Sequence, residues 1–436
     1  MALDIQKRVY SSDVQSKKEG SEVVVAGWAA EVKSLGKIAF IKLRDRDGYL
    51  QLVSTDAKLI GKISDLTNES VILASGKVKK SKLKAGGNEV ELENYEILSE
   101  ADPKLPIDMS GKIETDLSKR LDWRVLDLRR PEHGAVFKIQ SKLVEGAIEW
   151  LTKNGFTITF TPCLLGFPSE SGSEMFELPY FERKAFLRQD PQLHRQLTVI
   201  SGVERIADIG TSWRAELSHT TRHLTEHRTL AVEAGFIKDE YDVMKLEEQL
   251  VVAMITKVLQ DCKDELKYFP NADLKIPKTP FPVLEFPDVY KILEKAGHKE
   301  HKIDPEAEKI LAKHVKEKYG SDFFFLNRFP FEEKPFYVMR NDAEPKYARS
   351  TDMIYRGVEL SYGGQREHRY KTLMDNLKEK KMTPKLVEWF TQFFRYAAPP
   401  HGGFCIGIER ITMQLLALDN IREAALFPRD PTRLTP

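Results

Sequence analysis

The charged residues with the clearest chemical potential lie in a segment predicted to form two strands joined by a loop. Arg214 and Glu216 follow the first strand, Arg222 and His223 lie in the loop, and the second strand ends at Glu233. Guanidinium groups match phosphate oxygens in pairs, so a hairpin whose loop carries arginine could clamp a polyphosphate. A ladder of surface ion pairs would use the same residue types and stays open as the alternative.

Two further segments carry residues suited to a nucleotide and its metal ion. Asp352 and Glu359 lie seven residues apart on what we interpret as one β run, where strict alternation would place them on opposite faces. A bulge or a strand end could still bring both carboxylates to one Mg²⁺, which uses one or two carboxylates plus phosphates. Residues 402–410 form a glycine-rich β run leading into a helix, with Arg410 near the helix start; a tight turn would use the same glycines.

Another group of residues could contact nucleic acid. Five lysines lie between residues 77 and 84, where each could displace counterions from a phosphate backbone. Phe40 and Gln51, on adjacent predicted strands, could stack on bases and read their edges. An edge strand guarded by lysine would have the same composition.

Residues 223–227 match the H-x-x-E-H pattern of some zinc proteases. That chemistry needs a helix, which would place both histidines on one face. The threonines around the pattern favour extended chain instead, so we expect no metalloprotease.

The elements that must position these residues fall into distinct regions. Residues 22–100 contain five short alternating strands, with Asp47-Gly48 as a hairpin turn, which predicts a small closed barrel. An OB-fold is the commonest barrel of this size, and an SH3-like barrel is the alternative. Residues 101–130 are rich in proline and turn formers and read as a linker. Helical periodicity and β runs alternate from about residue 131, with a proline- and phenylalanine-rich insertion near 265–345.

Composition limits the class of protein. The chain has 436 residues, 41% of them apolar, and a net charge of 67 − 66 = +1, which argues weakly against a simple nucleic-acid coat. No apolar run approaches the ~18 residues of a membrane span, and the first twenty residues have no apolar core, so we expect no secretion. The three cysteines are far apart in the sequence, which excludes a disulfide scaffold and fits a reducing cytoplasm.

Several segments, in order, resemble class II aminoacyl-tRNA synthetases. TSWRAELSHTTRHLTE resembles motif 2 and GGFCIGIERITMQLL resembles motif 3. The helix followed by FTITFTP resembles motif 1, which in the family ends at a dimer-interface proline, here Pro162. YRGVELSYGGQREHR, FRYAAPPHGGF and the tail LFPRDPTRLTP are similar to the archaeal and eukaryotic type of aspartyl-tRNA synthetase, and the resemblance covers nearly the whole chain.

The resemblance implies an α+β fold with two domains. An OB-fold anticodon-binding domain would cover residues 1–105, a hinge 106–130, and a catalytic domain 131–436, built on an antiparallel sheet flanked by helices. The implied activity is ATP-dependent attachment of aspartate to tRNA through an aspartyl-adenylate, with ATP and Mg²⁺. The implied protein is a cytoplasmic homodimer without membrane association; whether it uses tRNA for aspartate alone or also for asparagine stays open.

The resemblance also implies a role for each matching position. The residues expected to bind ATP are Arg214, Glu216, Arg222, His223, Leu224, Glu359, Gly407 and Arg410, with Arg214 and Arg410 as catalytic residues. The residues expected to bind the amino acid are Glu170, Asp190, Gln192, Arg195, Glu233, Tyr362 and Arg366. Asp352 and Glu359 are expected to bind Mg²⁺, and Phe40, Gln51, Lys82 and Lys84 to contact the anticodon.

Four positions of the amino-acid pocket depart from the family pattern. Asp190 replaces a small serine, and Arg195 replaces a carboxylate-binding lysine. Ala231 replaces an aspartate that meets the substrate ammonium, and Tyr362 replaces a serine. Because Arg195 keeps a positive charge, we expect Arg195 and Arg366 together to select an anionic side chain. The alternative is a paralogue that activates asparagine or another amino acid.

Two other functions are also considered. An asparagine-synthetase-like ligase would form the same adenylate and pass it to ammonia, but such relatives lack the N-terminal barrel. A non-catalytic tRNA-binding paralogue would not be expected to keep Arg214, Glu359 and Arg410.

Overall fold

The computed structural model describes residues 3–81, 86–167, 175–215, 217, 220–300 and 302–436. The chain separates into two compact units, Met1–Pro131 and Glu132–Pro436. Lys82, Lys84, Glu170 and Glu216, four of the predicted site residues, lie outside the described residues. No helix in the described ranges is long and apolar enough to span a membrane.

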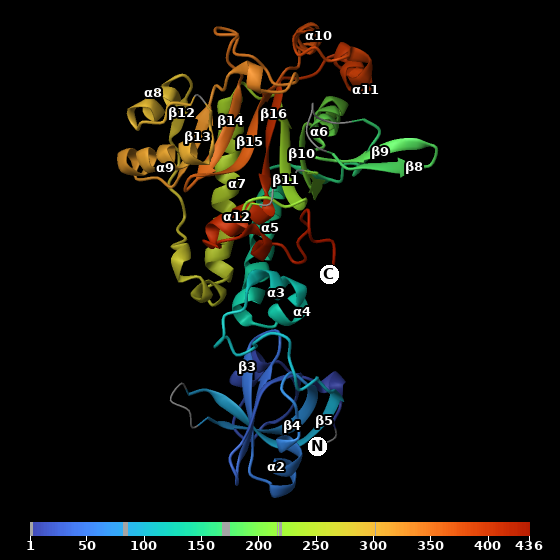
Figure 1. The fold of residues 1–436 in the computed structure, drawn as a ribbon, viewed down its shortest axis with the longest axis vertical. Helices are drawn as coiled ribbons and strands as arrows, with labels where there is room; N and C mark the ends of the chain where they lie inside the picture. The colour runs from blue at the N-terminus through green and yellow to red at the C-terminus, as the bar shows by residue number, and fades with distance from the viewer. Residues whose placement is uncertain (1–2, 82–85, 168–174, 216, 218–219, 301) are drawn as a thin grey trace. The chain divides into compact units, whose positions relative to one another are not determined.

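The N-terminal unit contains a closed five-stranded barrel (Figure 1). Its strands are β1 (Glu22–Ser34), β2 (Ala39–Arg44), β3 (Tyr49–Ser54), β4 (Val71–Lys80) and β5 (Asn88–Ser99), in the order β1-β2-β3-β5-β4. Alternate residues such as Ile41, Leu43, Leu50 and Leu52 fill the interior, as the period-2 pattern requires. The predicted closed barrel is therefore confirmed. The predicted turn at Asp47-Gly48 is confirmed as well, since β2 and β3 pair directly across it.

The linker region contains regular structure. The unit also has helices α1 (Ser11–Gln15), α2 (Ala57–Ser64), α3 (Leu117–Asp122) and α4 (Arg124–Asp127), of which α3 and α4 lie within residues 101–130. The buried Glu69 carboxylate accepts hydrogen bonds from Arg44, at 2.6 and 2.9 Å, and from Arg129 at 3.0 Å. These ion pairs tie the end of the linker region to the barrel within the same unit.

The C-terminal unit is built on an eight-stranded sheet in the order β12-β13-β14-β15-β16-β11-β10-β6. The strands are β12 (Val283–Glu285), β13 (Phe323–Asn327), β14 (Ser350–Tyr355), β15 (Val358–Arg366), β16 (His401–Gly407), β11 (Glu226–Gly235), β10 (Arg205–Trp213) and β6 (Thr157–Thr159). The six central strands are antiparallel as predicted, but β12 and β6 pair in parallel at the two edges. The sheet is therefore mixed. Parallel neighbours need crossover connections, and helices α8 and α9 supply one between β12 and β13.

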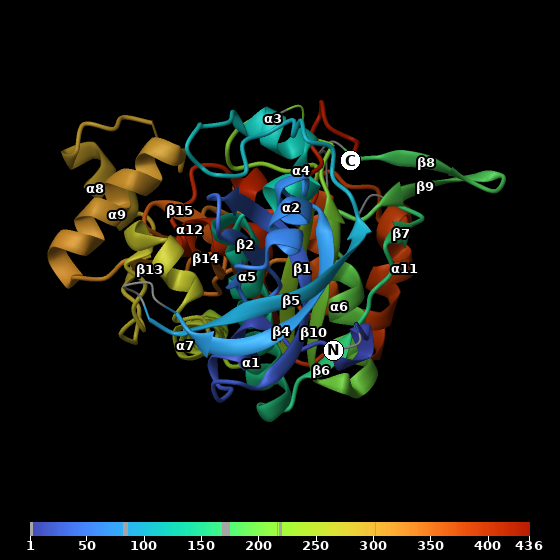
Figure 2. The same cartoon turned by 90° about the horizontal axis from the view of Figure 1, so that it is seen from below.

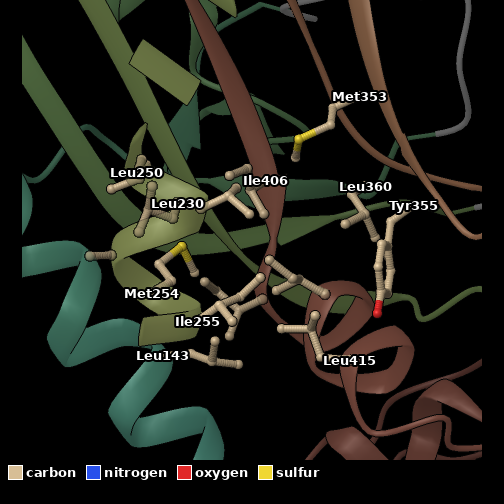
Figure 3. Close-up of a cluster of buried hydrophobic side chains, with 14 of the residues drawn as sticks. Leu143, Leu230, Leu250, Met254, Ile255, Met353, Tyr355, Leu360, Ile406 and Leu415 are labelled. Carbon is tan, nitrogen blue, oxygen red and sulfur yellow. The ribbon is translucent and has the colours of Figure 1, made fainter. Parts of the chain in front are cut away.

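Three helices bury one face of this sheet: α5 (Pro131–Lys153), α7 (Glu240–Asp261) and α12 (Ile408–Leu415). Leu143 of α5 and Met254 of α7 meet Leu230 and Ile406 from the strands in the main core (Figure 3). A Cβ at Gly146 of α5 would lie 2.7 Å from the Lys257 Cβ of α7, so only glycine permits this close helix packing.

The strand register assigns the other face of the sheet to the candidate site. Ala231, Cys405 and Tyr362 form a row across β11, β16 and β15, because paired residues of antiparallel strands point to the same face. Glu233 and Gly403 form the next row. Intervening residues face the helices, so the two faces are chemically distinct.

Further elements surround the sheet. Helices α8 (Asp288–Lys295) and α9 (Pro305–Tyr319) lie side by side at the β12–β13 edge in both views and share their own core cluster with β13 (Figures 1 and 2). A second, three-stranded sheet comprises β7 (Leu164–Leu165), β9 (Arg183–Leu187) and β8 (Glu177–Tyr180). Helices α6 (Gln192–Thr198), α10 (Tyr370–Glu379) and α11 (Glu388–Thr391) complete the unit.

Candidate functional site

A cavity of about 300 Å³ opens on the sheet face opposite the helical core. Every described residue predicted to bind ATP lines it: Arg214, Arg222, His223, Leu224, Glu359, Gly407 and Arg410. They come from the β10–β11 connection, from β15, and from the junction of β16 and α12. The predicted strand–loop–strand arrangement of 213–233 is therefore confirmed, and the separate segments meet around one space.

The arginines of the cavity are partly exposed and carry positive charge toward it. Arg410 Nη1 lies 3.5 Å from a carboxylate oxygen of Glu359 and donates to its backbone oxygen at 3.1 Å. Arg222 Nη1 lies 3.5 Å from Glu308 Oε2. Such a set of guanidinium groups suits the oxygens of a polyphosphate.

Sequence reasoning missed several residues of the same cavity. These are Gln189, His227, Thr229, Pro305, Glu308 and Glu409, among others. Glu308 lies on α9, and no local sequence pattern connects it to the arginines. Burial and the negative charge of Glu359 raise the pKa of Glu308 to about 7, and burial raises the pKa of Glu409 to about 7.

His227, the last residue of the H-x-x-E-H pattern, lines the cavity. It lies on strand β11, not on a helix, and no group of three or more metal-binding side chains occurs among the described residues. Burial and the charges of Arg214 and Arg410 lower its pKa to about 3. The imidazole is therefore neutral at physiological pH.

The arrangement of Asp352 and Glu359 differs from the sequence interpretation. They do not share one β run: Asp352 lies on β14 and Glu359 on β15, joined by a turn at Arg356 and Gly357. A register shift between Met353 and Ile354 accompanies this pairing. The antiparallel turn, rather than alternation along one strand, brings both carboxylates to neighbouring strands.

This pair fits a divalent cation. Burial and the nearby Glu359 charge raise the pKa of Asp352 to about 7, although Lys334 Nζ lies 3.6 Å from one of its oxygens. The other oxygen, Oδ1, is buried without a hydrogen-bond partner. A hard cation satisfies this oxygen and relieves the repulsion between the two carboxylates.

The described residues predicted to bind the amino acid form a buried network beside the cavity. Arg195 pairs with both oxygens of Asp190, with Nη2 at 2.8 Å, and also donates to Gln192 Oε1 at 2.6 Å. Arg366 donates to Glu233 Oε1 at 3.0 Å and to Gln192 Oε1 at 3.1 Å. The structure therefore brings these residues together, but each arginine already holds a carboxylate of the protein.

Two further contacts complete the network. The Tyr362 hydroxyl donates to Asp190 Oδ2 at 3.0 Å, and Tyr362 also lines the cavity. A Cβ at Gly403 would lie 2.6 Å from the Glu233 carboxylate, so glycine there leaves room for the Glu233–Arg366 pair. Tyr362 thus joins the closed network to the open cavity.

On the barrel, Phe40 and Gln51 lie on adjacent strands as predicted. Their positions alternate with core residues, which places them on the outer face of β2 and β3. Gln51 donates to Glu89 at 2.8 Å, so its amide nitrogen is engaged within the barrel. Lys42 and Tyr49, which sequence reasoning missed, lie beside them with the Lys42 ammonium 4.1 Å from the Tyr49 ring centre.

Comparisons with known proteins agree with this architecture. Residues 116–431 match the family described as tRNA synthetases class II (D, K and N), and residues 23–98 match the OB-fold nucleic acid binding domain. The aspartate–tRNA(Asp) ligase of Pyrococcus horikoshii is 41% identical over 98% of this chain and 99% of its own length. The aspartate–tRNA(Asp/Asn) ligase of Methanopyrus kandleri is 40% identical over 99% of this chain and 100% of its own.

Solved structures show the same fold. Asparaginyl-tRNA synthetase from Pyrococcus horikoshii, complexed with asparaginyl-adenylate, superposes with a TM-score of 0.92 at 32% identity, covering 98% of this chain and 99% of that one. Aspartyl-tRNA synthetase from Entamoeba histolytica superposes with a TM-score of 0.89 at 27% identity, covering 99% of this chain and 93% of that one. The protein is therefore a class II aminoacyl-tRNA synthetase of the D, K and N group with an N-terminal OB-fold domain.

Proposed function

We propose that this protein is an ATP-dependent aspartate–tRNA ligase. The observation that carries the proposal is the assembly of all described ATP-binding candidates around one cavity, which Tyr362 connects to the buried arginines of the amino-acid network. Aspartate is also the amino acid in the names of the two ligases reported above, from Pyrococcus horikoshii and Methanopyrus kandleri.

The first step of the proposed reaction is amino-acid activation. The α-carboxylate of aspartate attacks the α-phosphorus of ATP in line, and pyrophosphate leaves. Arg214 and Arg410 line the cavity where negative charge develops, and Arg222 and His223 contact the outer phosphates. Rate enhancement then comes from positioning and electrostatic stabilisation, without a covalent protein nucleophile.

Asp352 and Glu359 would hold Mg²⁺, which neutralises phosphate charge when bound. In the absence of that cation, the partly neutralised Asp352 carboxyl and the Arg410–Glu359 ion pair limit the repulsion at this edge of the site.

The second step transfers the amino acid. A hydroxyl of the tRNA 3′-terminal ribose attacks the carbonyl carbon of the adenylate, and AMP leaves. In this proposal residues 1–105 bind the anticodon through the outer face of β2 and β3, 106–130 form a hinge, and 131–436 form the catalytic domain with an insertion near 265–345. The proposed site of action is the cytoplasm, where translation takes place.

We also propose a homodimer. Apolar side chains are exposed around Pro162: Phe160 is 84% exposed and Leu164 45%. Exposed apolar surface of this kind favours contact with another chain. Light scattering should give twice the monomer mass, and Phe160→Asp should yield monomers; a monomeric parent protein would contradict the dimer.

Charging of tRNA tests the proposed function. Purified protein, ATP, Mg²⁺ and radiolabelled aspartate should produce aspartyl-tRNA, and the product should disappear without ATP. Removing residues 1–105 should weaken tRNA charging while leaving activation largely intact. If no amino acid is transferred to any tRNA fraction, the proposal is wrong; if both activities fall equally on deletion, the barrel supports the catalytic fold instead of binding tRNA.

A further inference from the structure

The pairing of Arg195 with Asp190 changes what the amino-acid pocket can select. Both side chains are almost fully buried, 0% and 3% exposed, and the guanidinium fork meets the carboxylate with two hydrogen bonds. The Tyr362 hydroxyl adds a third donor to the same carboxylate. Burial opposes the charge of Asp190, but Arg195 and these hydrogen bonds outweigh it and lower the carboxyl pKa. Asp190 is therefore ionised at neutral pH.

The positive and negative charges of the amino-acid pocket are also balanced as a whole. Among its described residues, Arg195 is matched by Asp190, and Arg366 by Glu233, which is fully buried. An incoming side-chain carboxylate would add a buried negative charge without a new cation. It would have to share an arginine with a carboxylate of the protein, and an imperfectly paired buried charge is costly. A carboxamide adds no charge.

The donors and acceptors that are left suit a carboxamide as well as a carboxylate. Arg195 Nε is buried and has no hydrogen-bond partner, so it offers a single N–H to a substrate oxygen. Either a carboxylate or an amide oxygen can accept it. Asp190 Oδ1 accepts one hydrogen bond, from Arg195, and keeps capacity for an amide N–H. That oxygen attracts an amide N–H and repels a carboxylate.

From this arrangement we infer that Asp190 is a specificity-determining residue. Because it pairs with the Arg195 cation, the enzyme activates asparagine as well as aspartate. The inference rests on the proposed ligase function and concerns only its amino-acid selectivity. It differs from the sequence-based expectation that two available arginines would select an anionic side chain.

The test is amino-acid-dependent ATP–pyrophosphate exchange by the full-length protein, with kcat/KM measured for aspartate and for asparagine. The ratio of the two values should lie within about tenfold in the parent protein, because the pocket charge is already matched. Asp190→Asn keeps the shape of the side chain and one acceptor for Arg195, but it leaves the positive charge of Arg195 without a carboxylate partner. This variant should raise the preference for aspartate by about tenfold or more.

Two other variants test whether the change in ratio comes from the charge of Asp190. Asp208→Asn removes the charge from another buried pair, Arg188–Asp208 at 3.3 Å, and should leave the aspartate/asparagine ratio unchanged. Tyr362→Phe removes one donor to Asp190, which leaves Asp190 more dependent on Arg195, and should lower the ratio by a smaller factor. If Asp190→Asn does not fold, as judged by thermal unfolding, Tyr362→Phe decides the question.

The outcomes separate this inference from the proposed function. A parent protein that prefers aspartate by much more than about tenfold, or a ratio that fails to rise in Asp190→Asn, overturns the inference and leaves the ligase function standing. Absence of exchange with every amino acid would refute the ligase function itself.

Discussion

The candidate site has two halves, the cavity proposed to bind the nucleotide and the buried network proposed to bind the amino acid, and these halves match their charges in opposite ways. In the nucleotide half, the side chains of Arg222 and Arg410 are each 27% exposed and line an open cavity. In the amino-acid half, the side chains of Arg195 and Arg366 are 0% and 4% exposed, and each is paired with a carboxylate of the protein. The first half is prepared for an external anion, whereas the second must exchange its own ion pairs for those of a substrate.

The carboxyl groups show the same difference. In and beside the nucleotide half, Asp352, Glu308 and Glu409 have pKa values raised to about 7, mainly by burial. In the amino-acid half, the charge of Arg195 overcomes burial and lowers the pKa of Asp190. Burial outweighs the nearby cations at Glu308 and Asp352, whereas the bidentate pairing with Arg195 keeps Asp190 in its charged form.

The largest expected effect is a difference in stability: removing a charge should lower the free energy of unfolding far more in the amino-acid half than in the nucleotide half. Glu233→Gln leaves the buried Arg366 without its charged partner and should lower the free energy of unfolding by about 3–5 kcal/mol. Glu359→Gln removes an exposed partner of Arg410 and should cost no more than about 1 kcal/mol. Urea denaturation followed by circular dichroism measures both. Equal losses would mean that the halves do not differ in how tightly their charges are matched.

Removing an arginine of the nucleotide half should lower the rate of catalysis without unfolding the protein. Arg214→Ala and Arg410→Ala should each lower the rate of adenylate formation by roughly 10²–10³, because each removes a donor to the developing phosphate charge. The fold should persist, since both side chains are partly exposed. Arg205→Ala, on the same strand as Trp213 but outside the cavity, is the control. Near-normal pyrophosphate exchange in either cavity variant would contradict the nucleotide assignment.

A smaller effect is expected from a substitution in the barrel. Such a substitution should change the activity of neither half of the candidate site. Phe40→Ala removes a stacking surface and should weaken tRNA binding by about 1–3 kcal/mol, seen as a higher KM for tRNA. Amino-acid activation should not change. Tyr319→Ala, an exposed aromatic at the end of α9, serves as the matched control. An unchanged KM for tRNA would argue against anticodon stacking on Phe40.

The smallest effect concerns pH. The folded-state pKa of Glu409 lies near 7, above the unfolded value of 4.5, so the folded protein binds this proton more tightly. Its contribution to stability is full below about pH 4.5 and is lost as pH rises through 7. Glu409→Gln should flatten the change of Tm with pH across this window. If Tm changed with pH in the variant as it does in the parent protein, the pKa of Glu409 would not be raised in the folded state.

Local sequence was sufficient to predict residues that meet around the cavity. Arg214 and Arg222 share one hairpin and Arg410 starts a helix after a glycine-rich strand, so their neighbours in the chain indicate their chemistry. The same reasoning failed for Asp352 and Glu359, because the turn at Arg356 and Gly357 was not recognised.

The amino-acid half could not be predicted in full. Its candidate residues were predicted from the sequence, but their partners depend on which strands pair and in which register. Arg366 and Glu233 are 133 residues apart and meet only because β15, β16 and β11 are neighbours. Glu308 was missed for the same reason, since α9 reaches the cavity from a segment that has its own core cluster.

Amino-acid-dependent ATP–pyrophosphate exchange, measured with every standard amino acid in turn, tests the account most directly. We expect exchange with aspartate and with asparagine, and loss of both in Arg410→Ala. We expect no exchange with lysine, because its buried cation would add a charge without a carboxylate of its own to pair with. Exchange with no amino acid, or only with one that carries a cationic side chain, would contradict the account.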